Sequence, residues 1–79
     1  MLKYTFPMDD FALFSECVEK LGTRYEFIDG LRTIIVSDYE IATVRSKYDE
    51  FELCANELTG PGSTVLELIG NFEDARLRR

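Results

Sequence analysis

Residues 37–61, SDYEIATVRSKYDEFELCANELTGP, decide the predicted fold. Apolar side chains recur there at steps of three and four, the period of one helix face, at Ile41, Val44, Tyr48, Phe51, Ala55 and Leu58. Ser37 and Glu40 have the spacing of a capping box. Gly60 and Pro61 are residues that stop a helix. We predict one long helix across a sheet, and the alternative use of its apolar stripe is a coiled-coil seam.

Two further elements are predicted before this stretch. Residues 2–6 alternate apolar and polar side chains, as a strand with one buried face does, and Pro7 ends the alternation. Residues 8–21 then carry a helical stripe. Asp9 and Asp10 lie in its first turn, where negative charge meets the positive end of the helix dipole. The chain therefore opens with a strand followed by a helix.

The dipeptide Asp29-Gly30 is the most specific local signal in the chain. It separates the strand-like runs RYEFI and LRTIIVS, and it tolerates the positive φ angles of a two-residue hairpin turn. The predicted register pairs Ile28 with Leu31, Phe27 with Arg32, Glu26 with Thr33, Tyr25 with Ile34 and Arg24 with Ile35. A β-hairpin over residues 24–36 follows.

This register assigns the two faces of the hairpin. The face expected to lie under the helices carries Tyr25, Phe27, Ile34 and Val36. The opposite face mixes polar residues with an apolar cluster of Ile28, Leu31 and Ile35. A sheet covered on one side only would leave this cluster in water, so it is a candidate partner-binding surface.

The pattern over residues 64–72 decides between two element orders. Its spacing fits a third helix with a second capping box at Thr64 and Glu67, although Gly70 interrupts the pattern and TVLELI also fits a short buried strand. A helix gives the order βαββαα, and a strand gives the ferredoxin-like order βαββαβ. We predict a single α+β domain over residues 1–79, with a small antiparallel sheet under two or three helices. Residues 76–79 form a basic tail that frays at its end.

Composition excludes several classes of function. Fifteen acidic residues against nine basic ones give a net charge of −6, which opposes binding to phosphate backbones and to anionic membranes. The chain has no His and no CxxC spacing, and Cys17 and Cys54 are expected as small apolar residues on helices. We predict a soluble cytoplasmic protein with no cofactor, no metal, no catalytic residues, no membrane contact and no direct contact with nucleic acid.

Acidic residues supply the second candidate partner-binding surface. They gather on the predicted long helix at Asp49, Glu50, Glu52 and Glu57. We expect a regulatory protein–protein interaction module that docks on a basic partner through this acidic helix face, or on another protein or a second copy through the apolar sheet face. Two alternatives stay open. One is an inhibitor of the kind made by phages, which mimics nucleic acid with a row at Asp38, Asp49, Glu52 and Glu57, and the other is a ligand-sensing ferredoxin-like dimer.

Overall fold

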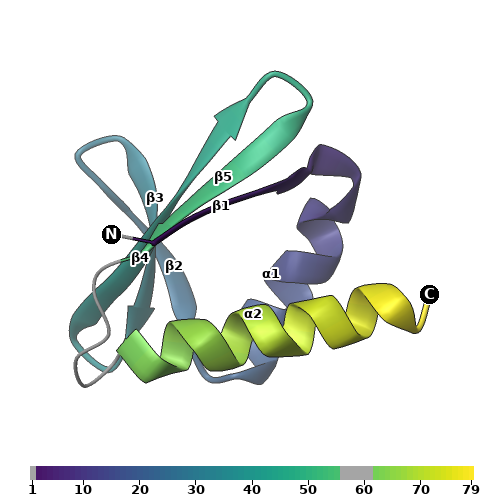
Figure 1. The fold of residues 1–79 in the computed structure, drawn as a ribbon. Coiled ribbons are helices and arrows are strands. Elements are labelled where there is room, and N and C mark those ends of the chain that lie inside the picture. The colour runs from purple at the N-terminus through teal and green to yellow at the C-terminus, as the bar shows by residue number, and fades with distance from the viewer. Residues whose placement is uncertain (1, 56–61) are drawn as a thin grey trace.

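Five strands and two α-helices form the described part of the chain, residues 2–55 and 62–79 of a computed structural model (Figure 1). The elements are β1 (Leu2–Pro7), a 3₁₀ turn η1 (Met8–Asp10), α1 (Phe11–Lys20), β2 (Arg24–Ile28), β3 (Leu31–Val36), β4 (Tyr39–Lys47), β5 (Glu50–Ala55) and α2 (Gly62–Leu77). The strands form one sheet in the order β1-β5-β4-β3-β2, and every neighbouring pair is antiparallel. The predicted α+β class with an antiparallel sheet is confirmed.

Most of the local predictions outside residues 37–61 are confirmed. The strand over residues 2–6 is β1, and the helix over residues 8–21 is η1 with α1. The β2–β3 hairpin has the predicted register at all five pairs, and its turn residues Asp29 and Gly30 have φ angles of 54° and 80°. Residues 64–72 belong to α2, so the ferredoxin-like order, which needs a strand there, is wrong.

The long helix predicted over residues 37–61 is wrong for residues 39–55. The chain forms β4 and β5 there, joined by a turn at Tyr48 and Asp49. The predicted helix stops at Gly60 and Pro61 lie outside the described residues. The observed element order is βαββββα, with a second β-hairpin in place of the middle helix of the predicted βαββαα order.

The apolar stripe of residues 37–61 joined residues that belong to two different strands. In β5 the buried residues alternate strictly with the more exposed ones, at Phe51, Leu53 and Ala55. In β4 a shift of register leaves Ile41 without a paired residue, and both Ile41 and Ala42 are buried. This β-bulge allows Ile41 to be buried as well as Ala42 and Val44, so that Ile41 and Val44, three residues apart, have the spacing of a helix face. Tyr48, which was predicted in the stripe, lies in the turn and is 94% exposed.

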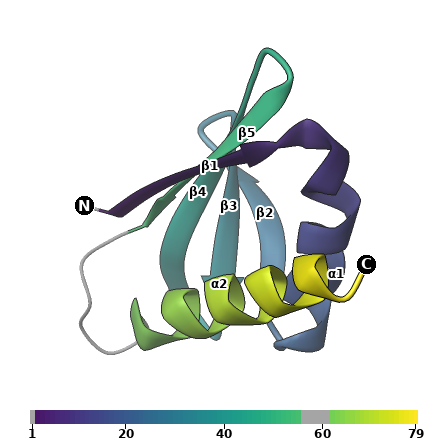
Figure 2. The same cartoon turned by 45° about the vertical axis from the view of Figure 1, so that its right-hand side comes forward.

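The core lies between the sheet and the two helices. Figure 2 shows α2 crossing the sheet, with α1 beside its C-terminal half. The centre of the core is aromatic: the ring centroid of Phe72 is 4.9 Å from that of Phe6 and 5.2 Å from that of Phe14. Phe51 lies 5.2 Å from Phe14 in the same cluster. Such edge-on and tilted ring pairs add about 0.5–1.5 kcal/mol each to the free energy gained by burial.

Helix α2 is amphipathic, and its apolar face packs against the sheet. Val65, Leu68 and Phe72 are fully buried, whereas Leu66 and Leu77 are exposed. These buried positions recur at steps of three and four, so one face of α2 packs on the core. Within the described residues, neither helix combines the length and the apolar character that crossing a membrane requires.

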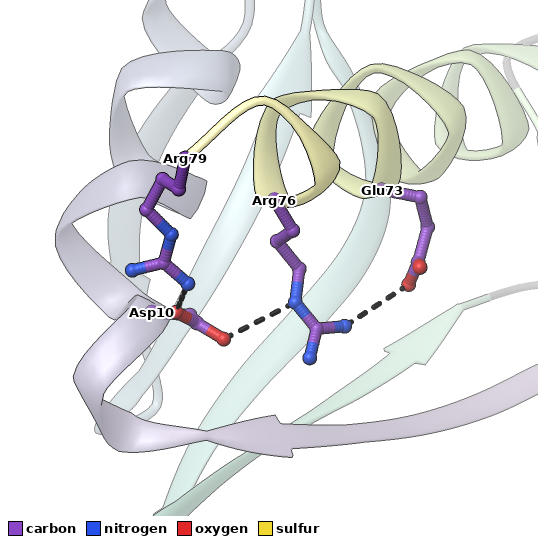
Figure 3. A network of polar contacts seen from close by, with 4 residues as sticks. All are labelled: Asp10, Glu73, Arg76 and Arg79. Carbon is purple, nitrogen blue, oxygen red and sulfur yellow. Dashed lines mark hydrogen bonds and ion pairs between the residues drawn. The ribbon is translucent and has the colours of Figure 1, made fainter.

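A buried carboxylate ties the two helices together. Asp10, at the start of α1, has Oδ2 3.2 Å from Nε of Arg76, and its Oδ1 accepts a hydrogen bond from Arg79 (Figure 3). Nη1 of Arg76 lies 3.4 Å from Oε1 of Glu73. The C-terminal end of α2 is therefore anchored to the N-terminal end of α1. The fraying predicted for residues 76–79 concerns motion and stays a prediction.

Candidate functional site

Two strands, β1 and β2, form the free edges of the sheet. In a two-residue hairpin the pair that flanks the turn exchanges both backbone hydrogen bonds, and bonded pairs alternate from there. In β2 this rule turns Ile28, Glu26 and Arg24 toward β3. The N–H and C=O groups of Tyr25 and Phe27 then point away from the sheet. Among the described residues, neither of these two makes a backbone hydrogen bond outside the sheet.

The β1 edge differs from the β2 edge in its outward groups. The same alternation of hydrogen-bonded pairs starts at the β4–β5 turn and continues through β5 to β1. It leaves the backbone groups of Lys3, Thr5 and Pro7 pointing away from the sheet. Pro7 has no N–H to donate, and a Lys on an edge strand opposes pairing with another chain. The sequence RYEFI of β2 contains no Pro. Its two charged residues, Arg24 and Glu26, pair with each other at 2.7 Å. The β2 edge is therefore the one better suited to accept another strand.

Aromatic rings and an arginine gather on the helix side of this edge. Arg32, on β3, is paired with Phe27 and lies with its Cζ 5.3 Å from the ring centroids of both Tyr25 and Phe27. The Cζ is also 5.0 Å from the ring centroid of Phe11, at the start of α1. We refer to Phe11, Tyr25, Phe27 and Arg32 as the aromatic–arginine cluster. It places a cation directly over the edge strand.

The guanidinium of Arg32 has no anionic partner in the described part of the chain. No carboxylate of residues 2–55 or 64–79 lies within ion-pair distance of it. A pocket of about 210 Å³ adjoins the cluster and is lined by Phe27, Arg32, Arg45 and Ser46, among others. Phe27 is 70% exposed. The site thus offers a cation, a hydroxyl and an aromatic face to a ligand.

A larger groove runs between α1 and the start of β2. Its volume is about 770 Å³, and its walls include Ala12, Ser15, Glu16 and Glu19 from α1. Tyr25 lines the β2 side, and its hydroxyl is 3.1 Å from Oγ of Ser15. Burial raises the pKa of Tyr25 above its ordinary value of 10.0, so this hydroxyl is protonated at neutral pH. The groove therefore has an acidic wall beside the free edge.

The predicted apolar sheet face is present but is not one continuous patch. Ile28, Leu31 and Ile35 share the face that points away from the helices. Ile28 and Leu31 are paired beside the turn and partly buried. Ile35 lies at the far end of β3, beyond the buried Thr33, and is only 5% exposed. The partner-binding role of these three residues stays a prediction.

The predicted acidic helix face is wrong for residues 39–55, where the chain forms the two strands β4 and β5. Asp49 is in the β4–β5 turn and Glu50 begins β5, both exposed. Glu52 is largely buried, with Oε2 3.9 Å from Nζ of Lys3. Glu57 lies outside the described residues. The nucleic-acid mimic loses its structural premise as well, since Asp38 and Asp49 lie in turns at opposite ends of β4.

The two thiols are free and protonated at neutral pH. Cys17 is buried in α1, as predicted, whereas Cys54 lies on β5 and not on a helix. Burial raises the pKa of both thiols, and the Glu52 carboxylate raises that of Cys54 further. Across residues 2–55 and 62–79, no group of three or more potential ligands is arranged to hold a metal ion.

Tyr25 and Phe27 lie on the sheet face predicted for them, but the exposure of Phe27 differs from the prediction. Phe27 was expected under the helices, and it is exposed because α1 does not extend over it. One sequence signal could have indicated this exposure: the predicted register pairs Phe27 with Arg32, a charged residue on an otherwise apolar face. The contribution of Phe11 could not be seen in the same way, because it depends on where α1 packs.

The comparisons with known proteins do not assign this chain to a family. No family model matches it, and neither the curated proteins nor the solved structures contain a significant match.

Proposed function

We propose that this protein is a non-enzymatic interaction module that binds an extended segment of another protein as a sixth strand, alongside β2. The observation that carries the proposal is the free edge of β2, where the alternation of hydrogen bonds turns the backbone groups of Tyr25 and Phe27 outward beside a groove. Strand addition of this kind draws affinity from the backbone and specificity from alternate side chains.

The side chains on this edge suit such a ligand. Phe27, at 70% exposure, gives an incoming strand an apolar surface to cover. Covering it removes aromatic area from water, which favours binding by about 25 cal/mol per Å². Tyr25 and Ser15 form the floor and wall of the groove, so the segment would lie between β2 and α1.

Charge favours a different protein over a second copy as the occupant. Two copies would each bring a net charge of −6 to the contact, and each would add Glu16 and Glu19 from its own α1. A segment with basic side chains beside α1 meets these two carboxylates favourably. The basic partner expected from composition thus remains part of the proposal, at a new location.

The proposal can be tested without a known partner. A phage-displayed library of random linear peptides, about ten residues long, is selected against the whole protein, and a synthetic copy of the best peptide is titrated into ¹⁵N-labelled protein. We expect the largest amide shift changes at Tyr25 and Phe27, together with downfield movement of their amide protons as hydrogen bonds form.

Three variants distinguish the contribution of the backbone N–H to peptide binding from that of the side chain. Phe27→Pro removes the outward N–H and should abolish binding, whereas Phe27→Ala keeps the N–H and should weaken binding about tenfold or less. Thr5→Pro makes the equivalent change on the β1 edge and should bind as the wild type does. If no peptide is enriched, or if Phe27→Pro binds as well as the wild type, the proposal is wrong. A concentration-dependent dimer that Phe27→Pro abolishes would identify a second copy as the occupant instead.

A further inference from the structure

We infer that Arg32 is a specificity-determining residue, which pairs with a carboxylate side chain on the added strand at the position opposite Phe27. This inference rests on the proposed function and names one chemical feature of its ligand. The segment would therefore combine basic residues beside α1 with one Asp or Glu beside the aromatic–arginine cluster.

The register of the β2–β3 hairpin brings Arg32 to the edge although it lies on the second strand. Phe27 and Arg32 form a pair without mutual backbone hydrogen bonds, and side chains approach most closely in such pairs. The guanidinium leans over β2, with Cζ 5.3 Å from the rings of Tyr25 and Phe27. A strand added to β2 would place the side chain opposite Phe27 on the same face, at a Cβ separation of about 5 Å. That side chain is within reach of the guanidinium.

The surroundings of Arg32 hold its side chain without neutralising it. Three ring faces contact the guanidinium, which fixes its position at a low cost in conformational entropy. No carboxylate of the described residues competes for it. Ser46, which shares the helix side of the sheet with Arg32, lines the adjoining pocket and adds a hydroxyl, whereas the neighbouring Arg45 belongs to the opposite face. A guanidinium held in this way can form two parallel hydrogen bonds to one carboxylate.

A carboxylate is favoured over a neutral group by the strength of charge-assisted hydrogen bonds. These bonds contribute more than neutral ones, and a partly buried site screens them less than open water does. Replacing the ligand carboxylate by its amide should therefore weaken binding about tenfold or more. A purely structural Arg32, which only packs on the rings, would show no such discrimination.

The test compares peptide selections against the wild type and Arg32→Gln. Peptides enriched on the wild type should share an Asp or Glu at one fixed position, and the Arg32→Gln selection should lose it. A synthetic peptide and its amide version, Glu to Gln or Asp to Asn, are then titrated into both proteins. We expect about a tenfold preference for the acid with the wild type and none with Arg32→Gln. Lys47→Gln, which removes the same charge from an exposed site on β4, should keep the preference.

The outcomes separate the two proposals. If the selected peptides shift Tyr25 and Phe27 but share no acidic position, or if Arg32→Gln keeps the preference, the role of Arg32 is refuted and strand addition stands. If the selected peptides shift residues elsewhere, the proposed function itself fails. An unchanged amide spectrum outside the cluster confirms that Arg32→Gln is folded, and the Nε–Hε signal of wild-type Arg32 should move with the acidic peptide alone.

Discussion

Nε of Arg76, in the last turn of α2, lies 3.2 Å from Oδ2 of Asp10, which directly precedes α1 and is only 4% exposed. Asp10 also accepts a hydrogen bond from Arg79. The carboxylate thus joins segments that are far apart in sequence (Figure 3). Removing a charge from a buried, hydrogen-bonded pair costs more than removing one from a solvated pair.

Asp10→Asn should therefore lower the free energy of unfolding by about 1–3 kcal/mol, because Arg76 and Arg79 both lose a buried anionic partner. Urea denaturation measures the change. Glu73→Gln is the matched control, since it removes the same charge from the half-exposed partner of Arg76 and should cost less than about 0.5 kcal/mol. Equal losses in the two variants would show that Asp10 does not anchor α2.

Phe51→Ala tests the aromatic core. Phe51 is fully buried on β5, with its ring centroid 5.2 Å from those of Phe11 and Phe14. The substitution should destabilise the protein by about 3–5 kcal/mol, through lost burial and the cavity left behind. Phe27→Ala removes an exposed Phe and should cost about 1 kcal/mol or less. A melting temperature that falls equally in both variants would contradict the burial of Phe51 and the exposure of Phe27.

Tyr48→Gly should stabilise the protein. Tyr48 has a φ angle of 60°, which is unfavourable for a residue with a Cβ, and its side chain is 94% exposed and loses almost no contact when removed. Relief of the left-handed conformation gives about 1–2 kcal/mol, and the added freedom of Gly in the unfolded chain takes back about 0.4–1 kcal/mol. The expected net gain is about 0.5–1 kcal/mol by urea denaturation. A loss of stability would mean that this turn has a different backbone conformation.

Stability should decrease in alkaline solution. Burial raises the pKa of the Cys17 and Cys54 thiols above their ordinary value of 9.0, and that of Tyr25 above 10.0. Above about pH 9 the unfolded chain therefore loses protons that the folded chain keeps, and the free energy of unfolding falls as pH rises. Urea denaturation at about pH 7, 9 and 10 measures this fall. A Cys17→Ala, Cys54→Ala double variant should lose the part that begins near pH 9, and a flat profile in the wild type would refute the assignment.

Local sequence signals predicted the elements whose geometry is set within a few residues. The Asp29-Gly30 turn fixes the register of the β2–β3 hairpin by itself, because a two-residue loop leaves one pairing. For residues 64–72 the apolar period favoured the observed helix but left a short strand as the alternative. The helix prediction was wrong for residues 39–55 because the structure of this segment depends on tertiary contacts. The alternation of Phe51, Leu53 and Ala55 competes with a helical stripe, and burial under α1 and α2 favours the strands.

In the candidate site, too, features set by local sequence were predicted and features set by tertiary contacts were not. Pairing of Phe27 with Arg32 was predicted, since it follows from the hairpin register. The exposure of Phe27 and the contact of Arg32 with Phe11 were not, because both depend on the position of α1. The edge position of β2 was equally hidden, since it required the knowledge that β4 pairs with β3.

Amide hydrogen exchange at β2, without and with the selected peptide, tests the central claim most directly. In the free protein the amides of Tyr25 and Phe27 should exchange rapidly, whereas those of Glu26 and Ile28, bonded to β3, should be protected. Adding the peptide should slow exchange at Tyr25 and Phe27 by about tenfold or more and leave the outward amides of β1 unchanged. Protection of Tyr25 and Phe27 in the free protein, or no change on adding the peptide, would contradict strand addition at this edge.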